Sequence, residues 1–126
     1  MPLFHAVVWI DHHNAKVLQF DAQQVQVRKV QAHNHNTGQH GSTVRTEHEF
    51  FGEVCDELAG IGQVVVTGSH MALTSFRHYV DKHRVSLVEH VLGWEIVDRP
   101  TEAQLVAYAR KYFVDHERLA HRERLS

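Results

Sequence analysis

A short run of valines constrains this chain more than any other feature. Residues 63–67 contain three consecutive valines and are bounded by Gly62 and Gly68. Consecutive apolar residues in a strand point to both faces of a sheet. The run therefore predicts a strand that is buried on both faces, which is typical of a central, parallel strand covered by helices.

Three further strands are predicted before this run. Residues 4–10 are apolar, rich in β-formers, and end at a polar turn cluster that begins with Asp11. Residues 15–20 and 24–32 follow after short polar connections, and the second of these ranges alternates valines with polar residues. Strands joined so closely predict an antiparallel meander.

Three helices and a fifth strand are predicted after the meander. Capping boxes at Thr46 with Glu49 and at Thr101 with Gln104 mark two helix starts, and Ser69 is the expected N-cap of the helix between them. The fifth strand covers residues 90–97. The apolar stripes of the helices are Phe50, Phe51, Val54, Cys55 and Leu58, then Leu73, Phe76, Tyr79 and Val80, then Leu105, Ala109, Tyr112 and Phe113.

The resulting element order is β-β-β-α-β-α-β-α. Right-handed crossovers between the later strands require a mixed five-stranded sheet with helices on its faces, which is a ribonuclease-H-like, three-layer α/β architecture. A length of 126 residues suits one domain that spans residues 1–126.

The overall charge gives no general argument for binding nucleic acid. With histidines neutral the net charge is −2, so any contact with RNA has to be local. The candidates are Arg28 with Lys29, and Lys82 with Arg84. Structure alone also explains both pairs, because cations protect an edge strand and are favoured at a helix C-terminus. Thirteen histidines make the charge sensitive to pH.

The single cysteine, Cys55, permits no internal disulfide and fits a reducing compartment. The N-terminus lacks the pattern of a signal peptide, and no apolar run reaches membrane-spanning length. We therefore expect a cytoplasmic protein.

Asp11 at the end of the first strand raises the hypothesis of a nuclease. Ribonuclease-H-like nucleases place a carboxylate there to hold Mg²⁺, but such a site needs several carboxylates, and Thr67, Gly68 and Ser69 offer none at the end of the fourth strand. The favoured alternative is that Asp11 starts a turn.

Histidines in the polar segment 33–42 raise the hypothesis of a metal site. His33 and His35 are alternate residues, and His40 can return a third imidazole, so a transition metal such as zinc is a candidate cofactor. No cysteine cluster or H-E-x-x-H motif accompanies them, and polar surface is the alternative.

The residues Gly68, Ser69 and His70 lead from the valine strand into a helix. Backbone N–H groups and a hydroxyl at this place can bind a phosphate or a carboxylate. The alternative is an ordinary glycine turn with a serine N-cap.

Two stretches of the sequence together resemble a known family. Residues 5–17, which read HAVVWIDHHNAKV, and residues 65–76, which read VVTGSHMALTSF, are similar to the bacterial translational machinery proteins. That family is related to the central domain of archaeal and eukaryotic peptide-chain release factors and of Pelota. The resemblance extends to residues 98–107, and it implies the same ribonuclease-H-like fold.

In release factors this domain carries a Gly-Gly-Gln loop that helps water attack peptidyl-tRNA. The resemblance places Gly38 and Gln39 in that loop as candidate catalytic residues, but Thr37 stands where the family has its first glycine. Threonine lacks the backbone freedom of glycine, so the resemblance implies a loop without full hydrolytic activity.

These observations leave a main hypothesis and two alternatives. The main hypothesis is a translation-associated accessory protein, without catalysis of its own, that docks on the ribosome or tRNA through residues 33–42 and the loop at Gly68. One alternative is a metal-binding hydrolase or nuclease that uses Asp11 or the set His33, His35 and His40. The other is a self-associating module that pairs through residues 24–32 as a sheet edge.

Overall fold

A computed structural model describes residues 4–32 and 42–125 of the chain. A five-stranded sheet forms its centre, with the strand order β3-β2-β1-β4-β5. The strands are β1 (His5–Ile10), β2 (Asn14–Phe20), β3 (Val25–Gln31), β4 (Gln63–Gly68) and β5 (Val91–Ile96). β1 runs antiparallel to β2 and parallel to β4, so the sheet is mixed, as predicted.

The valine run lies where its sequence predicts. β4 pairs in parallel with β1 on one side and with β5 on the other, and Val64, Val65 and Val66 are fully buried. Because apolar side chains leave β4 on both faces, each face of the sheet needs a layer of helices. This requirement generates the three-layer architecture.

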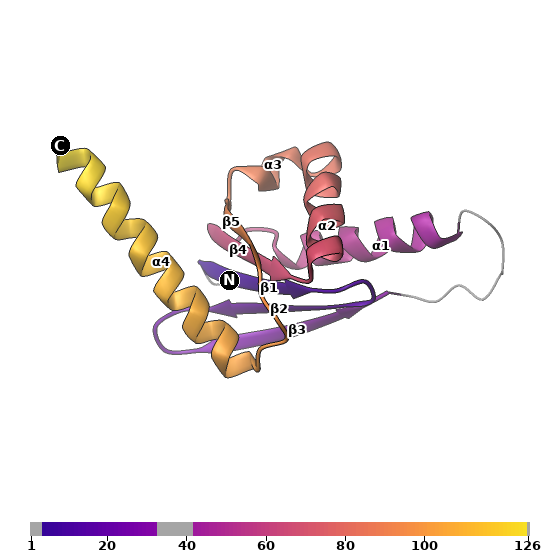
Figure 1. The fold of residues 1–126 in the computed structure, drawn as a ribbon, viewed down its shortest axis with the longest axis horizontal. Helices are drawn as coiled ribbons and strands as arrows, with labels where there is room; N and C mark the ends of the chain where they lie inside the picture. The colour runs from indigo at the N-terminus through magenta and orange to yellow at the C-terminus, as the bar shows by residue number, and fades with distance from the viewer. Residues whose placement is uncertain (1–3, 33–41, 126) are drawn as a thin grey trace.

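Helices α1 (Ser42–Glu57) and α2 (His70–His83) cover one face of the sheet, and α4 (Glu102–Leu125) crosses the other, as Figure 1 shows. Two apolar cores result. The first lies under α1 and α2 around Val8, Phe50 and Phe76, and the second lies under α4 around Leu18 and Phe113. The last part of α4 extends beyond the sheet.

The helix starts test three predictions from local sequence. Thr101 and Gln104 form a reciprocal capping box, since Gln104 N–H donates to Thr101 Oγ1 (3.1 Å) and Thr101 N–H donates to Gln104 Oε1 (2.9 Å). The box predicted at Thr46 is wrong, because α1 already begins at Ser42. No glycine or proline lies between Ser42 and Thr46, so the helix extends back to Ser42. The Glu49 carboxylate accepts a hydrogen bond from Arg45 Nε–H (3.1 Å), one helical turn earlier.

Ser69 occupies the predicted N-cap position of α2 but does not cap it with its side chain. Its carbonyl oxygen accepts the first helical hydrogen bond from Leu73 N–H (2.9 Å), whereas its Oγ is buried without a partner among the described residues. A one-turn helix, α3 (Val85–Val88), was not predicted and joins α2 to β5. Within the described residues, no helix combines the length and the apolar character needed to cross a bilayer.

Gly68 allows β4 and β1 to approach closely at the end of the sheet. A Cβ atom at this position would lie 2.2 Å from the carbonyl oxygen of Ile10. That oxygen belongs to the backbone of β1, so it cannot move aside without disturbing the sheet. The strand-to-helix turn therefore requires glycine.

We expect Gly68→Ala to lower the free energy of unfolding by about 1–3 kcal/mol, because the new methyl group meets backbone that is already paired. Denaturation in urea, followed by circular dichroism, measures this loss. Ser69→Ala is the matched control, since it removes a buried hydroxyl that has no partner and should leave stability unchanged or raised. An equal loss of unfolding free energy in both variants would contradict the requirement for glycine at position 68.

Cys55 lies in the first core, on the apolar face of α1, as its sequence position predicts. Burial of the thiol raises its pKa to about 11. Below that pH the thiolate, which is the reactive species, is scarce, so Cys55 has neither the access nor the ionisation that a nucleophile requires.

We expect Cys55 to react with a thiol reagent at least about 100-fold more slowly in the folded protein than in denaturant, because reaction requires an opening of the core. Stopped-flow absorbance with an aromatic disulfide reagent at pH 8 measures both rates. Similar rates in the two conditions would show that the thiol is accessible.

Candidate functional site

Three parallel strands end together at one edge of the sheet. Ile10 is in register with Gly68, and Gly68 is in register with Ile96, so β1, β4 and β5 present their carboxyl ends side by side. The turn at Asp11, the loop at Ser69 and the segment before α4 all leave from this edge. Ligands of open α/β sheets bind in such places.

Asp11 organises the turn between β1 and β2. Its Oδ1 accepts hydrogen bonds from the N–H groups of His13 (2.9 Å) and Asn14 (2.7 Å), and its Oδ2 lies 3.6 Å from Nη2 of Arg99. These contacts are those of a turn-forming residue, the alternative favoured from sequence. In the part of the chain that the structure describes, no three histidine, cysteine or acidic residues gather to form a metal site.

Trp9, the second-last residue of β1, anchors the segment before α4. Its Nε1–H donates to the carbonyl oxygen of Val97 (3.2 Å), and its ring lies beneath the guanidinium group of Arg99, with 5.8 Å from Cζ to the ring centroid. Trp9 is only 9% exposed, whereas the Arg99 side chain is 82% exposed. The indole and Asp11 thus hold an outward-facing guanidinium group.

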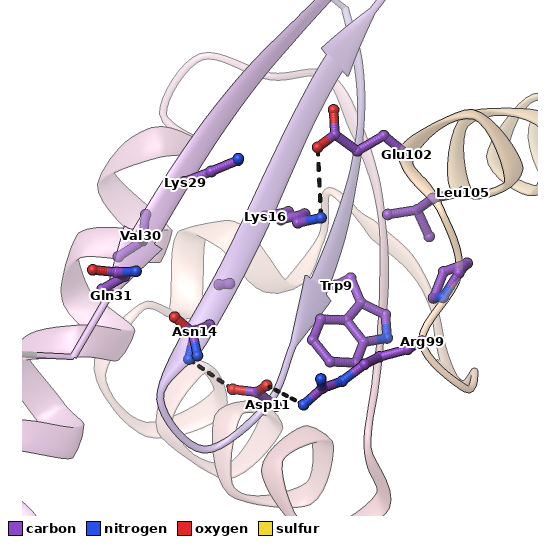
Figure 2. Close-up of a pocket in the computed structure, with 12 residues that line it drawn as sticks. Trp9, Asp11, Asn14, Lys16, Lys29, Val30, Gln31, Arg99, Glu102 and Leu105 are labelled. Carbon is purple, nitrogen blue, oxygen red and sulfur yellow. Dashed lines mark hydrogen bonds and ion pairs between the residues drawn. The ribbon is translucent and has the colours of Figure 1, made fainter.

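A cavity of about 330 Å³ lies beside these residues on the face that α4 covers (Figure 2). Trp9 and Leu105 contribute apolar surface to it. The charged groups that line it are Lys16, Lys29, Arg99, Asp11 and Glu102, so cations exceed carboxylates by one.

Lys16 and Lys29 lie directly opposite each other on β2 and β3. Like charges at directly opposed positions of an antiparallel pair destabilise a sheet. Glu102, placed by the capping box at the start of α4, lies 3.5 Å from Nζ of Lys16 and offsets part of this repulsion. Lys29 has no ion-pair partner among the described residues.

The structure places the predicted RNA contacts Arg28 and Lys29 on opposite faces of β3, and it shows a structural role for Arg84. Side chains alternate along β3, so Lys29 faces the α4 layer, whereas Arg28 faces α1 and lies 3.9 Å from Glu57. Arg84 ties α2 to α1, because it donates to Asp56 Oδ1 (3.0 Å) and to the carbonyl oxygen of Gly52 (3.5 Å). The hydrogen bond to Asp56 holds the pKa of Arg84 above its ordinary value.

Lys82 lines a second cavity of about 360 Å³ between α1 and α2, together with three histidines. The rings of His48 and His83 are 5.5 Å apart, Tyr79 packs against both, and His78 completes the wall.

The predicted anion site at Gly68, Ser69 and His70 lies at the carboxyl edge but is partly used by the fold. Ser69 N–H donates to the carbonyl oxygen of Ile10 (3.2 Å), and the carbonyl oxygen of Gly68 accepts from Val97 N–H (3.2 Å). The His70 side chain is exposed. These residues do not line the cavity beside Trp9.

The predicted loop residues His33, His35, Gly38, Gln39 and His40 lie outside the described residues. The segment that contains them starts at the same edge, because Ala32 N–H donates to the carbonyl oxygen of His13 in the Asp11 turn (2.8 Å). The described part of the chain after β3 therefore ends beside the turn at Asp11.

Solved structures of Pelota, of an archaeal translation termination factor and of a termination-like factor share this fold. The chain aligns with Archaeoglobus fulgidus Pelota at a TM-score of 0.63 and 15% identity, over 96% of this chain and 36% of Pelota. It shares its fold with Pelota. The archaeal translation termination factor aRF1 aligns at 0.58 and 14% identity, over 80% of this chain and 32% of that factor.

Dom34 of S. cerevisiae, a translation termination-like factor involved in RNA quality control pathways and interacting with Hbs1, aligns at a TM-score of 0.51 and 9% identity, over 95% of this chain and 40% of Dom34. The chain thus spans 32–40% of the length of these factors. At such identities the likeness shows the fold alone. No family model and no curated protein matches the sequence.

Of the residues that line the cavity beside Trp9, sequence reasoning named only Asp11 and Lys29 as candidates, and it missed Trp9, Lys16 and Arg99. Lys16 appears in the sequence as one polar residue of a short strand, and Arg99 as one residue of a loop 83 positions later. Trp9 appears as part of an apolar strand. A signal was present in the alternation of β2 and β3, which opposes Lys16 to Lys29 once the strands are placed in register.

We expect Asp11→Ala to lower the free energy of unfolding by about 1–2 kcal/mol, because two backbone N–H groups lose their acceptor. Asp11→Asn keeps a carbonyl oxygen at the same place and should lose less than half as much. Urea denaturation of the two variants measures the difference. A rise in Tm on adding Mg²⁺ to the wild type, absent from both variants, would instead identify Asp11 as a metal ligand.

Proposed function

We propose that this chain is a translation-associated accessory protein that docks on the ribosome or tRNA in the cytoplasm and has no catalysis of its own. The observation that carries the proposal is the fold shared with Pelota, with the translation termination factor aRF1 and with the translation termination-like factor Dom34. A fold by itself does not determine function, so the remaining support comes from the carboxyl edge of the sheet.

The two loops that the proposal uses leave the same edge of the sheet. Gly68 ends β4 next to Ile10, and the segment that follows β3 starts beside the turn at Asp11. Residues 33–42 include three histidines at 33, 35 and 40, and His70 is exposed at the start of α2. Histidine is the side chain that most often changes charge near neutral pH, so the proposal expects contact with RNA phosphates to strengthen as pH falls.

The absence of catalysis is proposed from the loop sequence. The resemblance implies the sequence Gly-Gly-Gln at residues 37–39, but this chain has Thr37 in place of the first glycine. Threonine has less backbone freedom than glycine. Hydrolysis of peptidyl-tRNA by the purified protein, lost in Gln39→Ala, would overturn this part of the proposal.

The contacts of Asp11 give the metal-dependent alternative no support, because its carboxylate serves a turn and faces Arg99. The set His33, His35 and His40 stays a prediction, and elemental analysis of the purified protein tests it. Self-association through β3 also stays a prediction. β3 lies at an edge of the sheet, where an unpaired strand can add a partner, and light scattering measures the outcome.

We expect the protein to sediment with purified bacterial ribosomes at low salt, to dissociate as salt rises, and to bind more tightly at pH 6 than at pH 8. Protonated histidines add charges that release counterions from RNA, which explains both dependences. Replacing His33, His35 and His40 by Gln should weaken the pH dependence, whereas His116→Gln, a change to an exposed histidine of α4, should not. Absence from every ribosomal fraction at low salt would reject the proposal.

A further inference from the structure

We infer that the cavity beside Trp9 binds one nucleotide of single-stranded RNA, with its base stacked on the Arg99 guanidinium and its phosphate held by Lys29 and Lys16. This inference deepens the proposed function and rests on it for the source of the RNA. The inference rests on three cations that lie around apolar surface in this cavity. Of these cations, only Lys29 was among the RNA contacts predicted from sequence.

The Arg99 guanidinium is placed by its contacts with Trp9 and Asp11. Its Cζ lies 5.8 Å from the centroid of the Trp9 ring, and Asp11 Oδ2 lies 3.6 Å from Nη2. The indole is itself fixed by its hydrogen bond to Val97, two residues before Arg99. With the side chain 82% exposed, the guanidinium is accessible to a base, and arginine planes stack on bases in RNA recognition.

The opposed lysines supply the phosphate contact. Lys16 and Lys29 face each other across β2 and β3, an arrangement that costs stability unless an anion lies between or beside them. Glu102 neutralises Lys16 only in part, at 3.5 Å, in an exposed pair that contributes little. A phosphate group would relieve the remaining repulsion and accept hydrogen bonds from both ammonium groups.

The size and the polar rim of the cavity fit one nucleotide. Its volume of about 330 Å³ lies at the lower end of the range of small-molecule sites, about 300–1000 Å³. Asn14 and Gln31 lie at its rim, as Figure 2 shows, and their amides can both donate to and accept from the edge of a base.

The chain contains a matched control for this geometry. Arg77 lies over Trp94 with 5.5 Å from Cζ to the ring centroid, the same type of cation–π pair as Arg99 over Trp9. Arg77 lies on α2, on the opposite face of the sheet, and does not line the cavity beside Trp9. Removing either arginine takes away one positive charge. If binding depends on the cavity, the loss of RNA affinity appears only when Arg99 is replaced.

The test measures binding of a fluorescein-labelled ten-nucleotide oligouridylate by fluorescence anisotropy. We expect Arg99→Ala to weaken binding about tenfold, in the range that stacking on one base contributes. Arg99→Lys keeps the charge but not the plane, so it should weaken binding by a similar factor. Arg77→Ala should bind as the wild type does.

Lys29→Ala should reduce the slope of log Kd against log salt by about 0.7, the value for one phosphate contact on a single strand, while Arg99→Lys should leave the slope unchanged. Thermal unfolding of each variant shows whether the fold is retained. Wild-type affinity in both Arg99→Ala and Lys29→Ala, or an equal loss in Arg77→Ala, would overturn the inference. Competition by free uridine monophosphate at concentrations near the Kd of the oligonucleotide would also overturn it, because the ligand would then be a free nucleotide.

Ribosome sedimentation of the same variants separates this inference from the proposed function. If the wild type sediments with ribosomes but oligouridylate binding does not depend on Arg99, the inference fails and the proposed function stands. If oligouridylate binding depends on Arg99 and Lys29 but the wild type never sediments with ribosomes, the nucleotide site stands and the proposed function fails.

Discussion

The parallel pairing of β1 with β4 is the interaction on which the rest of this structure depends. Both strands are buried on both faces, so the pair can exist only between two layers of helices, and α1, α2 and α4 supply those layers. The pairing also aligns Ile10 with Gly68. Their close approach, which only glycine permits, fixes where the turn at Asp11 and the loop at Ser69 leave the sheet.

Trp9 connects this pairing to the candidate site. Its side chain points toward the layer formed by α4, where its Nε1–H binds the carbonyl oxygen of Val97 and its ring supports Arg99. The capping box at Thr101 then starts α4 so that Glu102 lies next to Lys16. Four of the five charged groups around the cavity are therefore placed by contacts within the fold, two of them being the ion pairs of Arg99 with Asp11 and of Lys16 with Glu102.

The shared fold and the candidate site carry different kinds of information. Pelota, aRF1 and Dom34 share the arrangement of strands and helices at 9–15% identity, so the likeness extends to architecture. The cavity beside Trp9 is defined by side chains of this chain. Its surplus of one cation arises in a protein whose net charge is −2, which shows why total charge says little about a local surface.

The sequence by itself determined the valine strand, the meander, the stripe of each helix and the capping box at Thr101, because these follow from periodicity and from contacts within a few residues. It misplaced the start of α1 and gave no sign of α3, since neither is set by a local signal strong enough to override its neighbours. The alternation of side chains along a strand already places Arg28 and Lys29 on opposite faces, but only the tertiary structure brought Lys16, Lys29 and Arg99 together around one cavity. The physical reason is that strand register and the position of the segment before α4 depend on contacts between residues far apart in the chain, such as Trp9 and Val97, which are 88 positions apart, and no local pattern encodes them.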